Sequence, residues 1–179
     1  LSADQNFPDA VYYLATLYLN GIGTPQNPNK AHETFLNAAK LKMPDAYYNL
    51  SYNYLFGDGV KKDVPESIKW SNELINYTNV IQEIDNYYDL EGYQKLYFIY
   101  MWEDGYENYE KAFENAKILV NRRGTGTDYD RLAYFYQAGI ATEINYNKSF
   151  ELYSIADQKG ELNSKESLGN LYYDGNGTE

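Results

Sequence analysis

The feature that most constrains this chain is a repeat of 36 residues. Laid on itself at an offset of 36, the sequence places Asp9 on Asp45, Ala10 on Ala46, Tyr12 on Tyr48, Leu14 on Leu50, Tyr18 on Tyr54, Gly21 on Gly57 and Gly23 on Gly59. Seven identities at one offset are hard to obtain by chance. Self-similarity at such a period is typical of chains that stack one supersecondary unit many times.

Each unit has the pattern of a helix, a glycine turn and a second helix. Ala10, Leu14 and Tyr18 recur at every fourth residue, which places them on one face of a helix. A short polar residue follows the turn in four units, and it is Asn27, Asp63, Asn108 or Asn145. Each of these side chains can accept a hydrogen bond from the free amides of the helix that it precedes. Glu66, three residues after Asp63, predicts the reciprocal bond of a capping box.

The whole chain, residues 1–179, is expected to form a single repeat array, cut from a longer one at both ends. The units are expected at residues 9–43, 44–79, 91–124 and 127–160, with a partial unit at 161–179. An insertion at 77–90 has helical spacing and predicts an extended helix or an extra short one. Tyr97 stands where the other units have a small residue, which predicts different helix packing there.

The pattern resembles the Sel-1-like repeat family, a branch of the tetratricopeptide-like solenoids. In the first unit the resemblance is carried by Ala10, Leu14, Ala15, Tyr18, Gly21, Gly23, Asn27, Lys30, Ala31, Ala38 and Ala39, and in the second by Ala46, Leu50, Tyr54, Gly57, Gly59, Asp63 and Trp70. The resemblance implies an all-α fold, a right-handed α/α superhelical solenoid of antiparallel helix pairs. It also implies an adaptor or scaffold function with no enzymatic activity.

Composition narrows the classes of partner. A net charge of -11 would repel a phosphate backbone, which disfavours nucleic acid and anionic membrane as partners. The chain has no cysteine, so disulfides and thiolate metal sites are excluded, while cytoplasmic and exported locations both stay open. The longest apolar run, at residues 96–102, is too short to span a bilayer. His32 is the only histidine, and a lone helical histidine is expected to be solvated, with no catalytic or metal-binding role.

The related solenoids imply that first helices line a concave groove. The groove positions predicted as partner-binding are Tyr12, Tyr48, Tyr52, Phe56, Gln94, Phe98, Trp102, Asp130 and Tyr134. Large aromatic side chains on a rigid concave surface are typical of binding hot spots. The alternative is that several of these rings pack against a neighbouring second helix.

These patterns predict a non-catalytic protein-protein interaction module, an adaptor that binds a protein or peptide in the aromatic groove. The acidic balance favours a partner with basic residues at its rim. The same aromatic groove could instead stack on sugar rings, as in a glycan-binding envelope or secreted module. A third interpretation is a spacer between other domains. No cofactor or metal is predicted, because nothing in the sequence sets apart a set of ligands.

Overall fold

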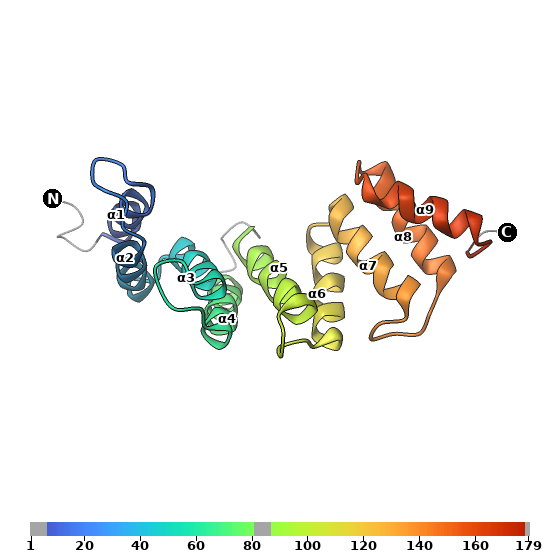
Figure 1. Cartoon of the computed structure of the whole chain (residues 1–179), viewed down its shortest axis with the longest axis horizontal. Coiled ribbons are helices and arrows are strands. Elements are labelled where there is room, and N and C mark those ends of the chain that lie inside the picture. Colours follow the sequence, from blue (N-terminus) through green and yellow to red (C-terminus); the bar gives the residue numbers. More distant parts are fainter. Residues whose placement is uncertain (1–6, 81–86, 178–179) are drawn as a thin grey trace. The chain divides into compact units, whose positions relative to one another are not determined.

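The computed structural model describes residues 7–80 and 87–177, and this part of the chain contains α-helices and no strand. The helices are α1 (Pro8–Asn20), α2 (Pro28–Lys40), α3 (Pro44–Phe56), α4 (Val64–Val80), α5 (Tyr87–Trp102), α6 (Tyr109–Arg122), α7 (Gly126–Ala138), α8 (Tyr146–Gln158) and α9 (Asn163–Tyr173) (Figure 1). The all-α fold predicted from the repeat is confirmed, and its unit is the helix pair.

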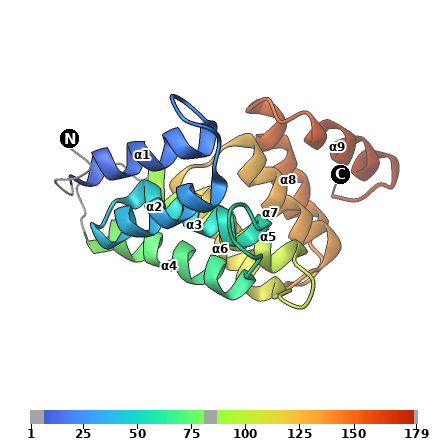
Figure 2. The same cartoon turned by 60° about the vertical axis from the view of Figure 1, so that its left-hand side comes forward.

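The helices divide into two compact units, Leu1–Lys95 and Leu96–Glu179, and the boundary falls within α5. In the first unit α1 packs on α2 and α3 on α4, while α2 also contacts α3 (Figures 1 and 2). In the second unit α7 packs on α8, and α6–α7 and α8–α9 contacts join neighbouring repeats. Each unit is therefore a stack of helix pairs, held together by contacts between one repeat and the next.

Proline and glycine set the limits of the first helices. Pro8 and Pro44 occupy the first positions of α1 and α3, where the missing amide costs no helical hydrogen bond. Gly21, Gly57 and Gly139 follow α1, α3 and α7 in the left-handed conformation that glycine adopts without strain.

The four predicted caps are confirmed. The side chains of Asn27, Asn108 and Asn145 each accept a hydrogen bond from the amide three residues later. Asp63 does the same for the amide of Glu66, at 3.1 Å. The reciprocal half of the predicted capping box at Asp63 is wrong. The Asp63 amide donates to the carbonyl of Tyr54, and the Glu66 carboxylate accepts from Lys69 instead.

The bond from the Asp63 amide to Tyr54 is one of a repeated set. In every complete helix pair, the amide of the cap residue donates to the carbonyl of a tyrosine near the end of the preceding helix. The bonds are Asn27 to Tyr18, Asp63 to Tyr54, Asn108 to Tyr100 and Asn145 to Tyr136, at 2.8, 2.8, 2.9 and 2.8 Å. A main-chain hydrogen bond thus closes each turn, whatever the side chains within it.

The core of the first unit lies between the helices of each pair. Ala15, Phe35 and Leu50 are fully buried there. Ser51, at a position that needs a small residue, is also buried, and its hydroxyl lies 2.7 Å from the Ser71 hydroxyl across the α3–α4 interface. These small side chains allow the two helices to approach closely.

The second unit has an aromatic core and a buried ion pair. Phe113 and Phe135 pack with ring centroids 5.2 Å apart, and Phe135 is fully buried. The Asp128 carboxylate, also buried, accepts two hydrogen bonds from the Arg123 guanidinium, at 2.6 and 2.9 Å. Thr125 caps α7 and completes a capping box with Asp128. The pair thereby fixes the start of α7, which carries part of the candidate site.

The prediction that His32 is solvated is wrong. His32 is 4% exposed, its Nδ1 lies 3.3 Å from the Asn53 side-chain amide, and its ring packs edge-on to that of Tyr54. The cause is the position of His32 on α2, beside Ala31 and Phe35 on the face that turns toward α3. Burial lowers its pKa, although the Glu33 carboxylate acts in the opposite direction.

The third repeat and the helix that precedes it depart from the pattern of the other repeats. The turn from α5 to α6 spans residues 103–108, one residue fewer than the turn at 57–63. α4 extends to Val80 and has 17 residues, against 13 in α2, so part of the predicted insertion lengthens this helix. Residues 81–86 of that insertion lie outside the described residues.

Candidate functional site

The predicted groove residues fall into two groups, one in each compact unit. The first group, here called the α3 cluster, consists of Tyr48, Tyr52 and Phe56. The second group, Phe98, Trp102, Asp130 and Tyr134, lines a pocket in the second unit. Tyr12 and Gln94 belong to neither group. Tyr12 is half-buried, with its ring 5.6 Å from that of Phe35 and its hydroxyl accepting from Asn49, and Gln94 is half-buried on α5.

The α3 cluster carries a cation from its own unit. Its side chains recur at every fourth residue of α3, so they lie along one face of the helix. The Lys95 ammonium lies 5.1 Å from the ring centroid of Tyr48, 5.0 Å from that of Tyr52 and 5.8 Å from that of Phe56. Burial lowers the pKa of Lys95, against the influence of Glu91. The three rings thus hold an ammonium group by cation–π attraction.

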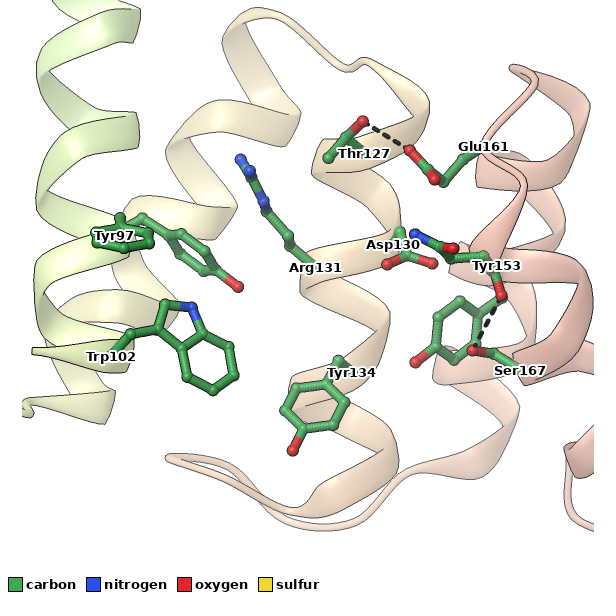
Figure 3. A pocket seen from close by; sticks show the side chains of 11 residues that line it. Tyr97, Trp102, Thr127, Asp130, Arg131, Tyr134, Tyr153, Glu161 and Ser167 are labelled. Atoms are coloured by element: carbon green, nitrogen blue, oxygen red, sulfur yellow. Dashed lines mark hydrogen bonds between the residues drawn. The ribbon is translucent and has the colours of Figure 1, made fainter.

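The pocket in the second unit, here called the α5–α9 pocket, has a volume of about 390 Å³. Its lining is Tyr97, Phe98, Trp102, Thr127, Asp130, Arg131, Tyr134, Tyr153, Glu161, Asn163 and Ser167. α5 supplies one wall, α7 the middle, and α8, α9 and the turn between them the opposite wall (Figure 3). Phe98, Trp102 and Tyr134 are 39%, 59% and 41% exposed, so their rings are available to a ligand.

The charged groups of the pocket are two carboxylates and one guanidinium. Asp130 accepts a hydrogen bond from the Ser164 hydroxyl at 2.7 Å, and Glu161 accepts one from the Thr127 hydroxyl, also at 2.7 Å. Burial raises the pKa of Asp130, and the Glu161 carboxylate adds to the increase. The hydrogen bond from Ser164 and the charge of Arg131 lower the pKa but do not cancel the increase. The negative charge of Asp130 is therefore poorly solvated.

Arg131 contributes a donor without a partner. Its guanidinium carbon lies 4.9 Å above the centre of the Tyr97 ring, which holds the side chain in place. Its Nη1 atom is buried and has no hydrogen-bond partner in the structure. A buried donor on a charged group gains free energy when a ligand supplies an acceptor.

Tyr97 and Tyr153 are the buried aromatic residues of the pocket lining. Tyr97, 6% exposed, packs edge-on to Phe135 with ring centroids 6.3 Å apart, so the large residue in the small-residue position shapes one wall. The Tyr153 hydroxyl donates to Gln137 at 2.9 Å, and burial raises the pKa of Tyr153 to about 12. These groups stay neutral at physiological pH and add no charge to the site.

Sequence reasoning missed the polar half of the pocket, which includes Arg131, Glu161 and Ser167. One signal was available for Arg131. At an offset of 36, Lys95 falls on Arg131, and each places its cation over an aromatic ring of the preceding repeat. A basic residue at matching positions of consecutive repeats could have predicted this pairing. Glu161 had no such signal, because it lies in a turn.

A metal ion is held in a protein by a group of side chains that act as ligands. Within residues 7–80 and 87–177, no three His, Asp or Glu side chains are grouped so as to hold a metal ion. None of the helices in the described ranges is both long enough and apolar enough to span a membrane. What the geometry does provide is exposed aromatic surface beside fixed charges, which suits recognition.

The Sel1 repeat family model matches residues 8–42, 44–73 and 129–160, more than half of the chain. The chain belongs to the Sel1 repeat family. The matches do not include the third repeat, where Tyr97 replaces the usual small residue. Sel1 repeats generally mediate protein–protein interaction, and the family is typically non-catalytic.

Solved structures have the same fold. A Sel1 repeat protein from Oxalobacter formigenes superposes with a TM-score of 0.78 at 22% identity, covering 100% of this chain and 67% of that one. The protein c5321, a protective antigen of uropathogenic Escherichia coli with an SLR fold, superposes with a TM-score of 0.80 at 29% identity. That match covers 99% of this Sel1 chain and 36% of the E. coli chain.

A short stretch of the chain matches a curated protein. A 52-residue stretch is 48% identical to HRD3B of Arabidopsis thaliana, an ERAD-associated E3 ubiquitin-protein ligase component. The stretch is 28% of this chain. The chain spans 34% and 9% of the lengths of two curated relatives that it matches.

Proposed function

We propose that this Sel1 chain is an adaptor that binds a protein or peptide partner through the aromatic side chains of its first helices, with the α5–α9 pocket as the principal site. One observation carries the proposal. Phe98, Trp102, Asp130 and Tyr134 were all expected at groove positions, and all four line the same pocket.

The chemistry of the pocket supports peptide recognition. Partly exposed aromatic rings bury a large apolar area at little entropic cost, because each has only two side-chain torsions. The rings project from helices whose cores are packed, so little ordering is needed on binding. HRD3B is a component of an E3 ubiquitin-protein ligase, and the components of such an assembly bind one another.

Charge should influence the rate of binding. The chain carries a net charge of -11, which favours a partner with basic residues at its rim and disfavours nucleic acid. We therefore expect association to slow as salt is added. An association rate that does not change with ionic strength would contradict the basic-rim part of the proposal.

The test is affinity capture from the native lysate with three baits. They are the wild type, a Trp102→Ala/Tyr134→Ala variant, and a matched control, Tyr172→Ala/Tyr173→Ala. Tyr172 and Tyr173 are 61% and 92% exposed on α9 and do not line the pocket. Circular dichroism should first show that both variants remain folded. Proteins retained by the wild type and the control, and lost by the pocket variant, would support the proposal.

Capture of the same proteins by all three baits would show that the pocket is not the protein-binding surface. Quenching of Trp102 fluorescence by soluble glycans would then favour the glycan-binding alternative. If emptying the pocket changes neither protein nor glycan binding, the spacer interpretation gains support.

A further inference from the structure

We infer that the α5–α9 pocket receives the basic side chain, Arg or Lys, of an extended polypeptide segment. The inference rests on the proposed function and specifies the ligand of the same site. Three features of the described residues carry it. They are the cation that the α3 cluster holds, the carboxylates of Asp130 and Glu161, and the Nη1 atom of Arg131, which has no hydrogen-bond partner.

The α3 cluster shows what such rings bind in this molecule. Tyr52 and Phe56 on α3 occupy the repeat positions that Phe98 and Trp102 occupy on α5. The Lys95 ammonium lies over the α3 rings. In the α5–α9 pocket the cation of the lining, Arg131, lies over Tyr97. The second set of rings can therefore take a cation from a partner.

The carboxylates provide the ionic complement. Asp130 and Glu161 each accept a hydrogen bond from a neutral hydroxyl, which leaves their charges in place. With Arg131 included, the lining carries two negative groups and one positive group. A guanidinium or ammonium group between these carboxylates and the face of Trp102 or Tyr134 would gain both ion pairing and cation–π attraction.

Arg131 indicates which hydrogen-bond acceptor the rest of the ligand should carry. Its buried Nη1 needs an acceptor. A carboxylate could supply one, but it would enter a pocket whose lining already carries the Asp130 and Glu161 carboxylates, and like charges repel. A peptide carbonyl is a neutral acceptor and avoids this cost. A Lys or Arg residue within a polypeptide supplies both groups, a carbonyl and a cation separated by a few bonds.

The volume of the pocket is consistent with one long side chain and the backbone that carries it. The volume of about 390 Å³ is near the lower end of the range for small-ligand sites, about 300–1,000 Å³. The walls come from helices and one short turn, so a bound segment would lie across α7 between α5 and α9 (Figure 3).

A displayed library of random peptides tests the inference with a defined probe. The library is selected on a Trp70→Phe protein, in which Trp102 is the only tryptophan, and depleted on the same protein with Trp102→Ala/Tyr134→Ala. We expect the enriched peptides to contain Arg or Lys. Replacing that Arg by neutral citrulline, or Lys by norleucine, should weaken binding about tenfold, read from Trp102 fluorescence.

Two charge variants locate the cation. Asp130→Asn should also weaken binding about tenfold, because it removes the charge but keeps an acceptor oxygen for Ser164. Glu114→Gln removes an equal charge from an exposed position on α6, outside the pocket, and should leave affinity unchanged. The citrulline and norleucine substitutions alter only the peptide, so their result does not depend on the folding of a variant.

The possible results distinguish a failure of the basic-ligand inference from a failure of the proposed function. Pocket-dependent peptides that lack a basic residue, or that bind Asp130→Asn as tightly as wild type, would overturn the basic-ligand inference and leave the proposed function intact. A library without any peptide that depends on Trp102 and Tyr134 would overturn both.

Discussion

Gly59 lies against the carbonyl group of Pro28, so closely that a Cβ atom at position 59 would overlap it. Gly177 stands in the same relation to Tyr146, and an offset of 118 relates both pairs. Pro28 and Tyr146 are the first residues of α2 and α8. The second glycine of the turn is thus a contact with the second helix of the preceding repeat, in addition to its role in the turn.

This contact predicts unequal effects of two similar substitutions. Gly23 and Gly59 have φ of 72° and 71°, but no atom lies within 4 Å of a Cβ built at Gly23. Gly23→Ala should cost about 1 kcal/mol for the left-handed backbone. Gly59→Ala should cost a further 1–3 kcal/mol, roughly, for the overlap. Urea unfolding followed by circular dichroism measures both, and equal losses would contradict the close contact.

Asp128 should dominate the acid sensitivity of the second unit. Burial acts to raise its pKa, but hydrogen bonds from Arg123 and Thr125 outweigh burial and leave the pKa below 3.8. A carboxyl group with a lowered folded-state pKa contributes stability above its unfolded-state pKa, and loses it as pH falls through the folded-state pKa. Asp128→Asn should cost about 3 kcal/mol at pH 7, with a smaller loss at acid pH.

Urea unfolding at neutral and at acid pH tests the Asp128 prediction. Asp104→Asn, at an exposed position, is the matched control and should change little. A loss from Asp128→Asn that is as large at acid pH as at neutral pH would show that the carboxylate charge is not what stabilises the start of α7.

Lys95 should titrate below the other lysines. Burial among the α3 cluster rings lowers its pKa from 10.5. Because the unfolded chain binds this proton more tightly, stability should rise with pH between the folded-state pKa and 10.5. NMR of reductively methylated, ¹³C-labelled protein reports each lysine, and Lys95→Arg assigns the resonance. Tyr52→Ala/Phe56→Ala should move the Lys95 pKa upward by admitting water; an unchanged value would contradict the role of the rings.

His32 gives a simple resonance to follow, since it is the only histidine. Burial lowers its pKa from 6.5, so its contribution to stability is present above that value and lost as pH falls through the folded-state pKa. The ring resonances of the folded protein should titrate below those of the same protein in urea. Identical titration curves in the two states would show that His32 is solvated in the fold.

The repeat signal was sufficient for the helix pairs and their ends. Caps such as Asn27 and Asp63 act on amides three residues away, so sequence spacing alone fixes the partner. His32 was misjudged because its lone occurrence was weighed without its neighbours. Ala31 and Phe35 mark the buried face of α2, and His32 lies beside them on the helix.

The candidate site could be predicted only in part. Fourfold spacing identified Phe98 and Trp102 as one face of α5, because a helix alone determines that relation. The approach of Asp130 and Ser164, by contrast, joins α7 to α9 across 34 residues. Such contacts depend on how neighbouring repeats pack. Tyr97 shows the difficulty, since its size predicted altered packing but not the pocket wall that it forms.

The main-chain bond from each cap amide to a tyrosine carbonyl has a consequence for how these loops can change. Because the bond needs no side chain, it persists where the turn has Gly-Ile-Gly, where Ala141 takes the second glycine position with φ of 56°, and where the turn at 103–108 is one residue shorter. We therefore expect a turn without such a tight contact, such as the one at 103–108, to accept an inserted epitope tag while its helix pair keeps its geometry.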